Sequence, residues 1–320
     1  MSFLNFDSNV FMAPMAGITD KPMREIIHSC GAGNLISEMV AVNAIQRKNP
    51  KSYKIADVSA EPYPVVVQLV GNNPELFADA AKLIAELGAK SIDINMGCPV
   101  KKIVNNNSGS ALMKDIWLAS QIITATVKAT SLPVSVKFRT GWDSEHLNAV
   151  NFAQMCEESG ASYITVHGRT RAQGYSGTAD WNIIAEVKNA VKIPVIGNGD
   201  IDSPKTAKEK IKQSGVDGVM IGRAMLGNPW LLNQTDYYLK TGKQLPLPQV
   251  SDIHSMLIKH LHLLVEYYGE KAGISISRKH IGWYVKNFYE AKKFREQYTK
   301  LNFLKDAENL INEYFMRVAQ

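Results

Sequence analysis

The sequence predicts an α/β protein in which a (β/α)8 TIM barrel is followed by a C-terminal all-α helical domain. Eight short apolar runs recur between residues 9 and 222, and each is followed by a loop and a helical pattern. The runs are continuously apolar rather than alternating, which is typical of parallel strands covered on both faces. Beyond about residue 245 only helical periodicity remains. Eight strand–helix units are the number that closes a barrel of this type.

The eight apolar runs are the expected strands. They are Asn9–Met12, Leu35–Glu38, Val65–Leu69, Ile92–Asn95, Val134–Phe138, Tyr163–His167, Val195–Gly197 and Val219–Ile221. The alternative fold is an open doubly wound sheet. Such a sheet normally carries a G-x-G-x-x-G fingerprint after its first strand, whereas this chain has APMAGITD there.

Two of the intervening helices have clear ends. NPELFADAAKLIAELGAK begins with Asn73 as the cap and Pro74 in the first turn, and it ends at Gly88. SPKTAKEKIKQSG begins in the same way with Ser203 and Pro204 and ends at Gly215. Proline in the first turn and glycine after the last turn are common helix boundaries.

Two domains are expected, a catalytic barrel over residues 1–244 and a helical domain over residues 245–320. KQLPLPQ has the composition of a linker between them. Apolar residues of the C-terminal part recur every three or four positions, which predicts amphipathic helices. They are Ile253, Met256, Leu257, Leu261, Leu264 and Tyr268, and then Leu304, Ala307, Ile311, Tyr314 and Val318.

The composition is that of an ordinary soluble globular protein, with 45% hydrophobic and 21% charged residues. The N-terminus lacks a basic region followed by a long apolar core, and no segment reaches the roughly 18 apolar residues of a membrane span. Cys30, Cys98 and Cys156 form neither a disulfide framework nor a zinc-ligand spacing, so no metal is expected. Together these features indicate a cytoplasmic protein.

The net charge of +6 is unevenly distributed. Residues 251–320 hold 11 Lys/Arg against 8 Asp/Glu, so half of the excess lies on less than a quarter of the chain. This distribution favours an acidic partner such as nucleic acid.

Polar and glycine-rich motifs follow the predicted strands. In chain order they are PMAG (Pro14–Gly17), Gln68, NMGCP (Asn95–Pro99), KFRTGW (with Lys137 and Arg139), HGRT (with His167 and Arg169), NGD (Asn198–Asp200) and GRAM (with Gly222 and Arg223). Because the active site of such barrels lies at the carboxyl ends of the strands, the motifs predict one functional site. The last two favour phosphate, which the loops after strands 7 and 8 commonly bind.

Lys137 leaves several chemistries open. It could form a Schiff base, contact a phosphate, or lie beside a flavin and stabilise the reduced form of that flavin. Gln68 could hydrogen-bond the pyrimidine edge of a flavin, and His167 could do the same or hold the substrate. Spacing alone does not choose among these roles.

Taken together, the motifs resemble those of the tRNA-dihydrouridine synthases. APMAGITDKPMR, SEMV, QLVG, DINMGCPVKKIV, GSALM, VKFRTGW, HGRTR, PVIGNGDI and MIGRAMLGNPW follow the order of that family. SRKHIGWYVK (Ser277–Lys286) in the helical part is also similar to it. The resemblance runs from about residue 10 into the helical tail and is strongest to the bacterial B-type subfamily.

The resemblance implies a barrel that binds FMN, takes hydride from NADPH and reduces a uracil in the D-loop of folded tRNA. The flavin ring would be lined by Pro14, Met15 and Ala16 and contacted by Gln68, Lys137 and His167. The ribityl phosphate end would be held by Asn198, Gly199, Asp200, Gly222 and Arg223. The substrate uracil or its surroundings would be met by Asn95, Arg139 and Arg169, with His167 also facing the uracil or the flavin.

Cys98 would be the proton donor of this reaction. Saturating the C5–C6 bond adds a hydride from flavin N5 to C6 and a proton to C5. A thiol with a pKa of about 8.5 is mostly neutral at pH 7 and can donate, whereas a carboxylate is mostly ionised there. The Gly97-Cys98-Pro99 turn keeps the thiol on a loop that can close over a base. Cys30 and Cys156 lie in helical patterns and are expected to be inert.

The substrate base must be turned out of folded RNA at a cost of a few kcal/mol, and binding elsewhere on the RNA must offset that cost. We expect Arg278–Phe294 to form one helix, with an apolar face made of Ile281, Val285 and Phe288. The opposite face would carry Lys279, Lys286 and Lys293 beside Trp283, which suits phosphate contact and base stacking. Arg278, Lys279 and Lys286 are therefore candidate tRNA contacts.

Lys101 and Lys102, just after the cysteine loop, are further candidate tRNA contacts. The neighbouring Asn105-Asn106-Asn107 is less basic than the resemblance implies. We therefore expect a weaker grip on phosphate there, or one shared differently with the helical tail.

Three other functions are compatible with parts of this pattern. A flavin barrel acting on a free pyrimidine, similar to dihydroorotate or dihydropyrimidine dehydrogenases, explains the site and Cys98 but not the basic tail. A flavin-free aldolase-like barrel would use Lys137 as a Schiff base. An RNA-binding module with an inactive flavin site would bind tRNA without oxidising NADPH.

Overall fold

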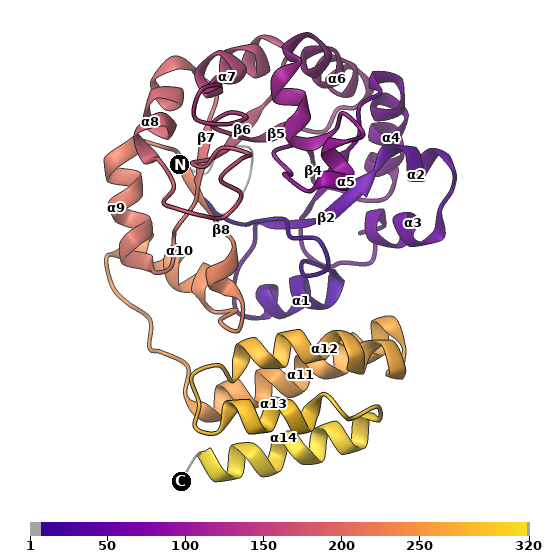
Figure 1. Ribbon diagram of the computed structural model, residues 1–320, viewed down its shortest axis with the longest axis vertical. Coiled ribbons are helices and arrows are strands. Elements are labelled where there is room, and N and C mark those ends of the chain that lie inside the picture. Colours follow the sequence, from indigo (N-terminus) through magenta and orange to yellow (C-terminus); the bar gives the residue numbers. More distant parts are fainter. Residues whose placement is uncertain (1–7, 319–320) are drawn as a thin grey trace. The chain divides into compact units, whose positions relative to one another are not determined.

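The computed structural model describes residues 8–318 (Figure 1). The chain divides into two compact units. The barrel unit holds the residues up to Asp20 and Gly33–Gly222, and the helical unit holds Lys21–Ala32 and the residues from Arg223 onward. The assignment of catalysis to residues 1–244 and tRNA binding to residues 245–320 concerns function and stays a prediction.

Within residues 8–318, eight parallel strands form one sheet in the order β1-β8-β7-β6-β5-β4-β3-β2. The strands are β1 (Val10–Met12), β2 (Leu35–Ala41), β3 (Val65–Val70), β4 (Ser91–Met96), β5 (Val134–Arg139), β6 (Tyr163–His167), β7 (Val195–Asn198) and β8 (Gly218–Ile221). A parallel bridge between Phe11 and Asn34 joins β1 to the start of β2, so the barrel is nearly closed. The predicted TIM barrel is confirmed, and every predicted apolar run coincides with one of these strands.

Helices follow the strands of the barrel unit. They are α2 (Val42–Gln46), α3 (Pro50–Ala56), α4 (Pro74–Glu86), α5 (Lys101–Val104), α6 (Ile116–Ala129), α7 (Ala149–Glu158), α8 (Trp181–Ala190) and α9 (Pro204–Ser214), with a 3-10 helix η1 (Gly109–Lys114). Both predicted helix starts are confirmed, because the side chains of Asn73 and Ser203 accept backbone N–H groups of the first turns of α4 and α9.

The interior of the barrel is apolar over part of its length. Side chains of six strands, and of the residue that follows β1, meet there: Phe11, Ala13, Ile36, Val66, Tyr163, Ile196 and Met220. Successive residues of a strand point to opposite faces, so residues two positions further along also point inward. This rule directs Thr165, Asn198 and Gly222 into the carboxyl end of the barrel, where the site described below lies.

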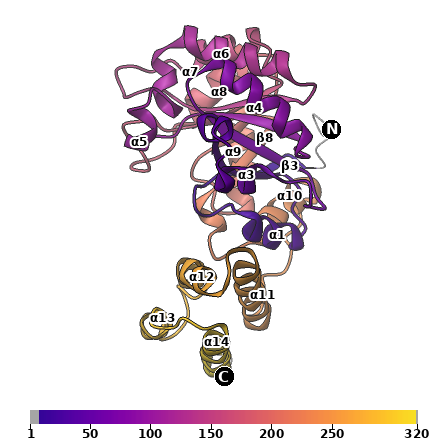
Figure 2. The same cartoon turned by 90° about the vertical axis from the view of Figure 1, so that its right-hand side faces the viewer.

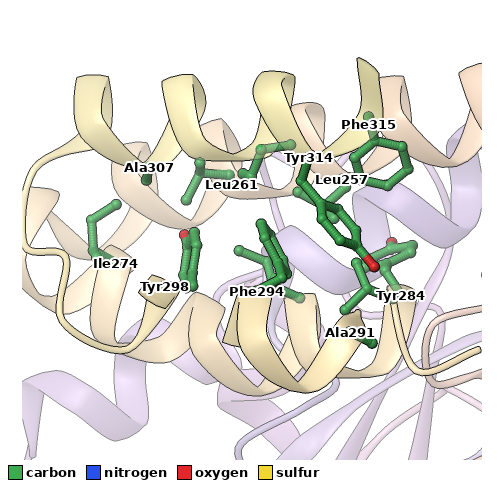
Figure 3. Close-up of a cluster of buried hydrophobic side chains, with 13 residues drawn as sticks. Leu257, Leu261, Ile274, Tyr284, Ala291, Phe294, Tyr298, Ala307, Tyr314 and Phe315 are labelled. Atoms are coloured by element: carbon green, nitrogen blue, oxygen red, sulfur yellow. The ribbon is translucent and has the colours of Figure 1, made fainter. Parts of the chain in front are cut away.

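The helical unit is built from α1 (Lys21–Ser29), α10 (Leu231–Thr241), α11 (Val250–Tyr268), α12 (Glu270–Tyr284), α13 (Ala291–Tyr298) and α14 (Leu304–Val318), with a 3-10 turn η2 (Arg223–Met225). Figure 2 shows α12, α13 and α14 almost end-on as a bundle with α11. Their shared core holds Phe294 stacked on Tyr314 at 4.2 Å between ring centroids (Figure 3). The predicted helical C-terminal part is confirmed, and none of the helices within residues 8–318 has the length and hydropathy of a membrane span.

The prediction of a single helix over Arg278–Phe294 is wrong. Helix α12 ends at Tyr284, turns follow, and α13 begins at Ala291 after Glu290, whose φ of 51° is left-handed. The hydroxyl of Tyr314 donates to the carbonyl oxygen of Tyr289 at 2.7 Å, and so occupies an acceptor that a continuous helix would use. The break also lets Phe294 return to the core, whereas a straight helix of that length would extend about 25 Å. Lys279, Lys286 and Lys293 therefore do not form one helical stripe.

Candidate active site

A chain of hydrogen bonds links three strands at the carboxyl end of the barrel. The amide nitrogen of Gln68 on β3 donates to Asp93 on β4 at 2.6 Å. The amide nitrogen of Asn95, also on β4, donates to the Gln68 oxygen at 2.9 Å. Ser135 on β5 donates to the other Asp93 oxygen at 2.6 Å. All four side chains are buried, so each strand contributes a polar group that the others satisfy.

Asn95 carries this network into the NMGCP loop. Its side-chain oxygen accepts the backbone N–H groups of Gly97 at 3.2 Å and Cys98 at 2.9 Å. The Cys98 carbonyl in turn accepts the backbone N–H of Ser110 at 3.1 Å and its hydroxyl at 3.0 Å. A methyl group on Gly109 would come within 2.9 Å of that carbonyl, so this glycine keeps η1 close to the loop. The backbone of Cys98 is thus held from both sides.

The Cys98 side chain is half-buried and is not in a disulfide. Burial raises the pKa of its thiol, and this effect outweighs the opposing influence of the Val100 backbone N–H and the positive charge of Arg139. The thiol is therefore protonated at neutral pH. Cys30 and Cys156 are buried, and burial also raises the pKa of their thiols, to about 12 for Cys30. Those two cysteines have the environment predicted for inert thiols.

Lys137 on β5 lies inside the barrel and donates to the side-chain oxygen of Asn198 on β7 at 3.1 Å. Asn198 in turn donates to the Met220 carbonyl on β8 at 2.8 Å. Burial and the charge of Arg139 lower the pKa of Lys137 to about 8, while Asp93 opposes the shift. At pH 7 the lysine still carries its charge, so the barrel interior holds a cation on a fixed support.

Arg139 at the end of β5 connects two loops. Its Nε donates to the Gly97 carbonyl at 2.8 Å, and Nη1 donates to the carbonyls of Thr170 and Gly174 at 2.9 Å and 2.8 Å. The guanidinium also lies 5.7 Å from the ring centroid of Tyr175, which is 59% exposed. Arg139 therefore positions the cysteine loop and the loop after β6 through the hydrogen bonds that it donates.

Arg169 is buried and is engaged by the protein. Its Nη2 forms an ion pair with Asp200 at 2.7 Å and donates to the Gly177 carbonyl at 2.7 Å, while Nε donates to the Ser176 carbonyl at 3.1 Å. The predicted contact of Arg169 with substrate remains untested, and its visible contacts stabilise the loop after β6. The carboxylate of Asp200 accepts from this guanidinium and from the Ala179 N–H.

Glycines in the loops after β7 and β8 let another group come close to the backbone. Gly199 has φ 131° and a methyl group there would come within 2.5 Å of Ala179, so only glycine suits the position. The next residue, Asp200, has a left-handed φ of 51°. At Gly222 an added methyl group would meet only Ala13, at 3.5 Å, so the interior is open at this point. Arg223 directly follows Gly222 and opens η2.

The PMAG loop after β1 is held by its own turn. The Met15 carbonyl accepts the backbone N–H groups of Ile18 and Thr19 at 3.0 Å each, and Gly17 donates to the carboxylate of Glu38 on β2. Gly17 has φ 74°, a conformation that glycine adopts without strain. Pro14, Met15 and Ala16 thus lie on a fixed loop at the carboxyl end of β1.

The comparisons with known proteins bear on this arrangement. The family model described as dihydrouridine synthase (Dus) matches residues 11–320. The chain belongs to the dihydrouridine synthase family. A probable tRNA-dihydrouridine synthase from Rickettsia typhi is 46% identical over 316 residues, which cover 98% of this chain and 97% of the relative. A tRNA-dihydrouridine synthase B from Pseudomonas aeruginosa is 45% identical over 294 residues, 92% of this chain and 89% of the relative.

Solved structures share the barrel with this family member. Histamine dehydrogenase from Rhizobium sp. 4-9 matches with a TM-score of 0.57 at 12% identity, over 81% of this chain and 49% of that chain. The 6-hydroxypseudooxynicotine amine oxidase from Pseudomonas geniculata N1 matches with the same TM-score at 13% identity, over 81% and 50%. At this identity the likeness concerns the fold alone. The family membership predicted from the motifs is confirmed.

Sequence reasoning missed several residues of this family member's site. Asp93 and Ser135 lie inside strands that read as apolar runs, and their inward direction is visible only from the period of two. Thr165 was missed for the same reason; its hydroxyl is buried and, within the described residues, has no hydrogen-bond partner. Tyr175 lies in a loop, 6.5 Å from the His167 ring and next to Arg139, and no motif singled it out.

The candidate tRNA contacts differ in exposure. Lys101 and Lys102 on α5 and Lys286 after α12 are exposed. Arg278 donates to the Leu301 carbonyl at 3.1 Å and so connects α12 to the segment before α14. Lys279 is half-buried, and its charge contributes to lowering the pKa values of His260 and His280. Lys286 is exposed, and within residues 8–318 its side chain has neither a hydrogen bond like that of Arg278 nor a position beside buried histidines like that of Lys279.

Proposed function

We propose that this chain is a flavin-dependent tRNA-dihydrouridine synthase, an oxidoreductase that reduces the C5–C6 bond of uridines in the tRNA D-loop with FMN and NADPH. Family membership and the names of relatives 45% to 46% identical support the reaction and the RNA substrate. FMN, once reduced by NADPH, supplies the hydride when it is bound. The remaining chemistry falls to the residues of this chain.

The observation that carries the proposal is that the Cys98 thiol is protonated and that the backbone of its loop is held in place. The reaction needs an acid that is neutral at pH 7 and can release a proton to C5 of the uracil. The Cys98 thiol meets this need because burial raises its pKa. Two backbone N–H groups of its loop are fixed by Asn95, which keeps the donor at one place above the barrel.

The interior of the barrel suits a flavin. Its donor set includes the Lys137 ammonium, the unpartnered Thr165 hydroxyl and the remaining amide hydrogens of Gln68 and Asn95. These groups match the carbonyl oxygens and ring nitrogens of a flavin, and Lys137 would stabilise negative charge on the reduced ring. We place Pro14, Met15, Ala16 and His167 beside the ring. We place Asn198, Gly199, Asp200, Gly222 and Arg223 near the phosphate.

We propose that the helical unit binds tRNA through the turn between α12 and α13. Tyr289 is 80% exposed there, and Lys286, Lys292 and Lys293 around it are exposed as well. The Tyr314 hydroxyl holds the carbonyl of Tyr289, so the backbone that carries the exposed ring is held in place. An aromatic ring among cations suits a stacked base and its phosphates. This turn between α12 and α13 takes the place of the straight lysine stripe expected from the sequence. Arg278 and Lys279 would contact tRNA as well. Lys101 and Lys102 would contact it from the rim of the barrel.

Dihydrouridine mapping tests the proposal. Unmodified tRNA is incubated with purified protein, FMN and NADPH, and the position of each dihydrouridine is determined. Formation at a defined D-loop position supports the proposal. If no dihydrouridine forms in tRNA while free uracil or orotate is turned over, the chain is a free-pyrimidine reductase instead. Full tRNA binding without NADPH oxidation would indicate a binding module with an inactive flavin site.

A further inference from the structure

Asp93 begins the chain of hydrogen bonds that ends at the Cys98 loop. We propose that Asp93 is a positioning residue, whose carboxylate dictates the orientation of the Gln68 and Asn95 amides and thereby fixes the backbone of Cys98. The catalytic importance of this effect rests on the proposed function. The effect itself is a property of the folded chain and can be measured without tRNA.

The direction of each hydrogen bond in this series follows from what each group can donate or accept. A side-chain amide has a donor end and an acceptor end of nearly equal size, so its neighbours decide which way it points. An ionised carboxylate only accepts. Gln68 must therefore turn its nitrogen to Asp93, which leaves its oxygen facing Asn95.

The same constraint then passes to Asn95. Because its nitrogen must donate to the Gln68 oxygen, its own oxygen is directed at the loop. That oxygen accepts both the Gly97 and the Cys98 N–H groups. If either amide were reversed, two donors or two acceptors would face each other in a buried site, and each would lose its hydrogen-bond partner.

The carboxylate form of Asp93 is supported by its surroundings. One oxygen accepts from Ser135 and the other from Gln68, each at 2.6 Å. Burial raises the pKa of Asp93 to about 6, while these two hydrogen bonds and the charge of Lys137 oppose the shift. At pH 7 to 8 the group is therefore mainly ionised and accepts only.

A charge-swap pair of variants tests the direction of these hydrogen bonds. In Asn95→Asp alone, carboxylates lie at both ends of the Gln68 amide, and its one donor end can serve only one of them. Adding Asp93→Asn removes the conflict. Gln68 can then donate to position 95 and accept from the new amide at position 93, which accepts from Ser135. Asp93→Asn alone also leaves every group with a partner, because a hydroxyl both donates and accepts.

The readouts are the rate of iodoacetamide alkylation at Cys98, followed by mass spectrometry, and the thermal unfolding midpoint of the purified flavoprotein. We expect Asn95→Asp to change the alkylation rate about tenfold and lower the midpoint, and the double variant to return both towards wild type, since groups of one network couple strongly. Asn73→Asp, which keeps the α4 cap, is the control for an added carboxylate. Buried Cys30 and Cys156 are internal controls.

The pH dependence gives a second readout. Protonating either carboxyl group of Asn95→Asp, at position 93 or 95, supplies the missing donor to Gln68. Lowering the pH from 8 to about 5.5 should therefore bring the alkylation rate of the variant closer to that of wild type measured at the same pH. The proposal is wrong if Asn95→Asp has no effect, or if the two substitutions add or worsen each other. Failure of the proposed function would instead show as a wild-type protein that leaves tRNA unreduced while this rescue is still observed.

Discussion

The guanidinium of Arg139 donates from Nε to the carbonyl oxygen of Gly97 at 2.8 Å, one residue before Cys98. The same side chain donates from Nη1 to two carbonyls of the loop after β6. Asn95 on β4 accepts the N–H groups of the cysteine loop. Arg139 on β5 donates to a carbonyl of the same loop. The position of Cys98 thus depends on β4 and β5 together.

Arg139→Lys is expected to lower tRNA reduction by about 10- to 100-fold. A lysine cannot donate from two nitrogens to both loops as the guanidinium does, and a misplaced Cys98 thiol is an inefficient proton donor. Dihydrouridine formation per minute measures the loss. Bound flavin should remain, since Lys137 and Asn198 keep their contact. Arg47→Lys, at an exposed site after α2, is the matched control. Unchanged turnover in Arg139→Lys would show that donation to both loops is not needed.

Cys98→Ala is expected to reduce turnover by about 10²- to 10⁴-fold while flavin content and tRNA affinity remain near wild type, because only the proton donor is removed. Single-turnover reduction of tRNA and a tRNA binding titration separate the two properties. Cys30→Ala is the control, since that thiol lies in the helical unit. Full activity in Cys98→Ala would remove the thiol from the mechanism.

The strands were predictable because parallel strands covered on both faces are mostly apolar, as Val65–Val67 and Leu69–Val70 are on either side of Gln68. The site motifs were predictable because they follow those strands. The roles of single cations were not. Arg169 is predicted as a substrate contact beside His167, and the structure adds contacts that the sequence did not show: Nε and Nη2 donate to the Ser176 and Gly177 carbonyls and to Asp200, which lies 31 residues away. Such contacts depend on the folded path of the loop.

The break between α12 and α13 was also beyond the sequence pattern. Ile281, Val285 and Phe288 keep a helical period across it, and no glycine or proline marks the turn. The turn is stabilised by tertiary contacts, above all the Tyr314 hydroxyl on the Tyr289 carbonyl. Local periodicity carries no information on a hydrogen bond 25 residues away.

The helical unit should lose stability in mild acid. His260 and His280 are buried with ring centroids 4.5 Å apart. Burial lowers the pKa of His260 to about 3 and that of His280 further, and the neighbouring Lys279 lowers both. Tyr284 faces His260 from α12, and no carboxylate contributes to either shift.

The sign follows from proton binding. Below about pH 6.5 the unfolded chain binds protons at these histidines and the folded unit does not, so stability is lost as the pH falls from 6.5 towards 3. Each histidine contributes up to about 1.4 kcal/mol per pH unit. Urea unfolding of wild type and His280→Leu at pH 7.5 and 5.0 measures the effect. The variant should lose less stability on acidification, while His146→Gln, at an exposed pair with Asp143, should behave like wild type.

Replacing Lys286, Lys292 and Lys293 by glutamine should weaken tRNA binding and flatten its salt dependence. Each phosphate contact releases counterions, and its loss lowers the slope of log K against log salt by roughly 0.7 to 0.9. The matched control removes three exposed lysines from the segments that lead into barrel strands: Lys90, Lys128 and Lys192. Tyr289→Ala should weaken binding by the roughly 1–3 kcal/mol of a stacked base without changing the slope. If the two triple variants had equal slopes, tRNA would not be bound at this turn between α12 and α13. A reduced slope for the α12–α13 variant alone, together with the unchanged slope of Tyr289→Ala, would separate phosphate contact from stacking at one site.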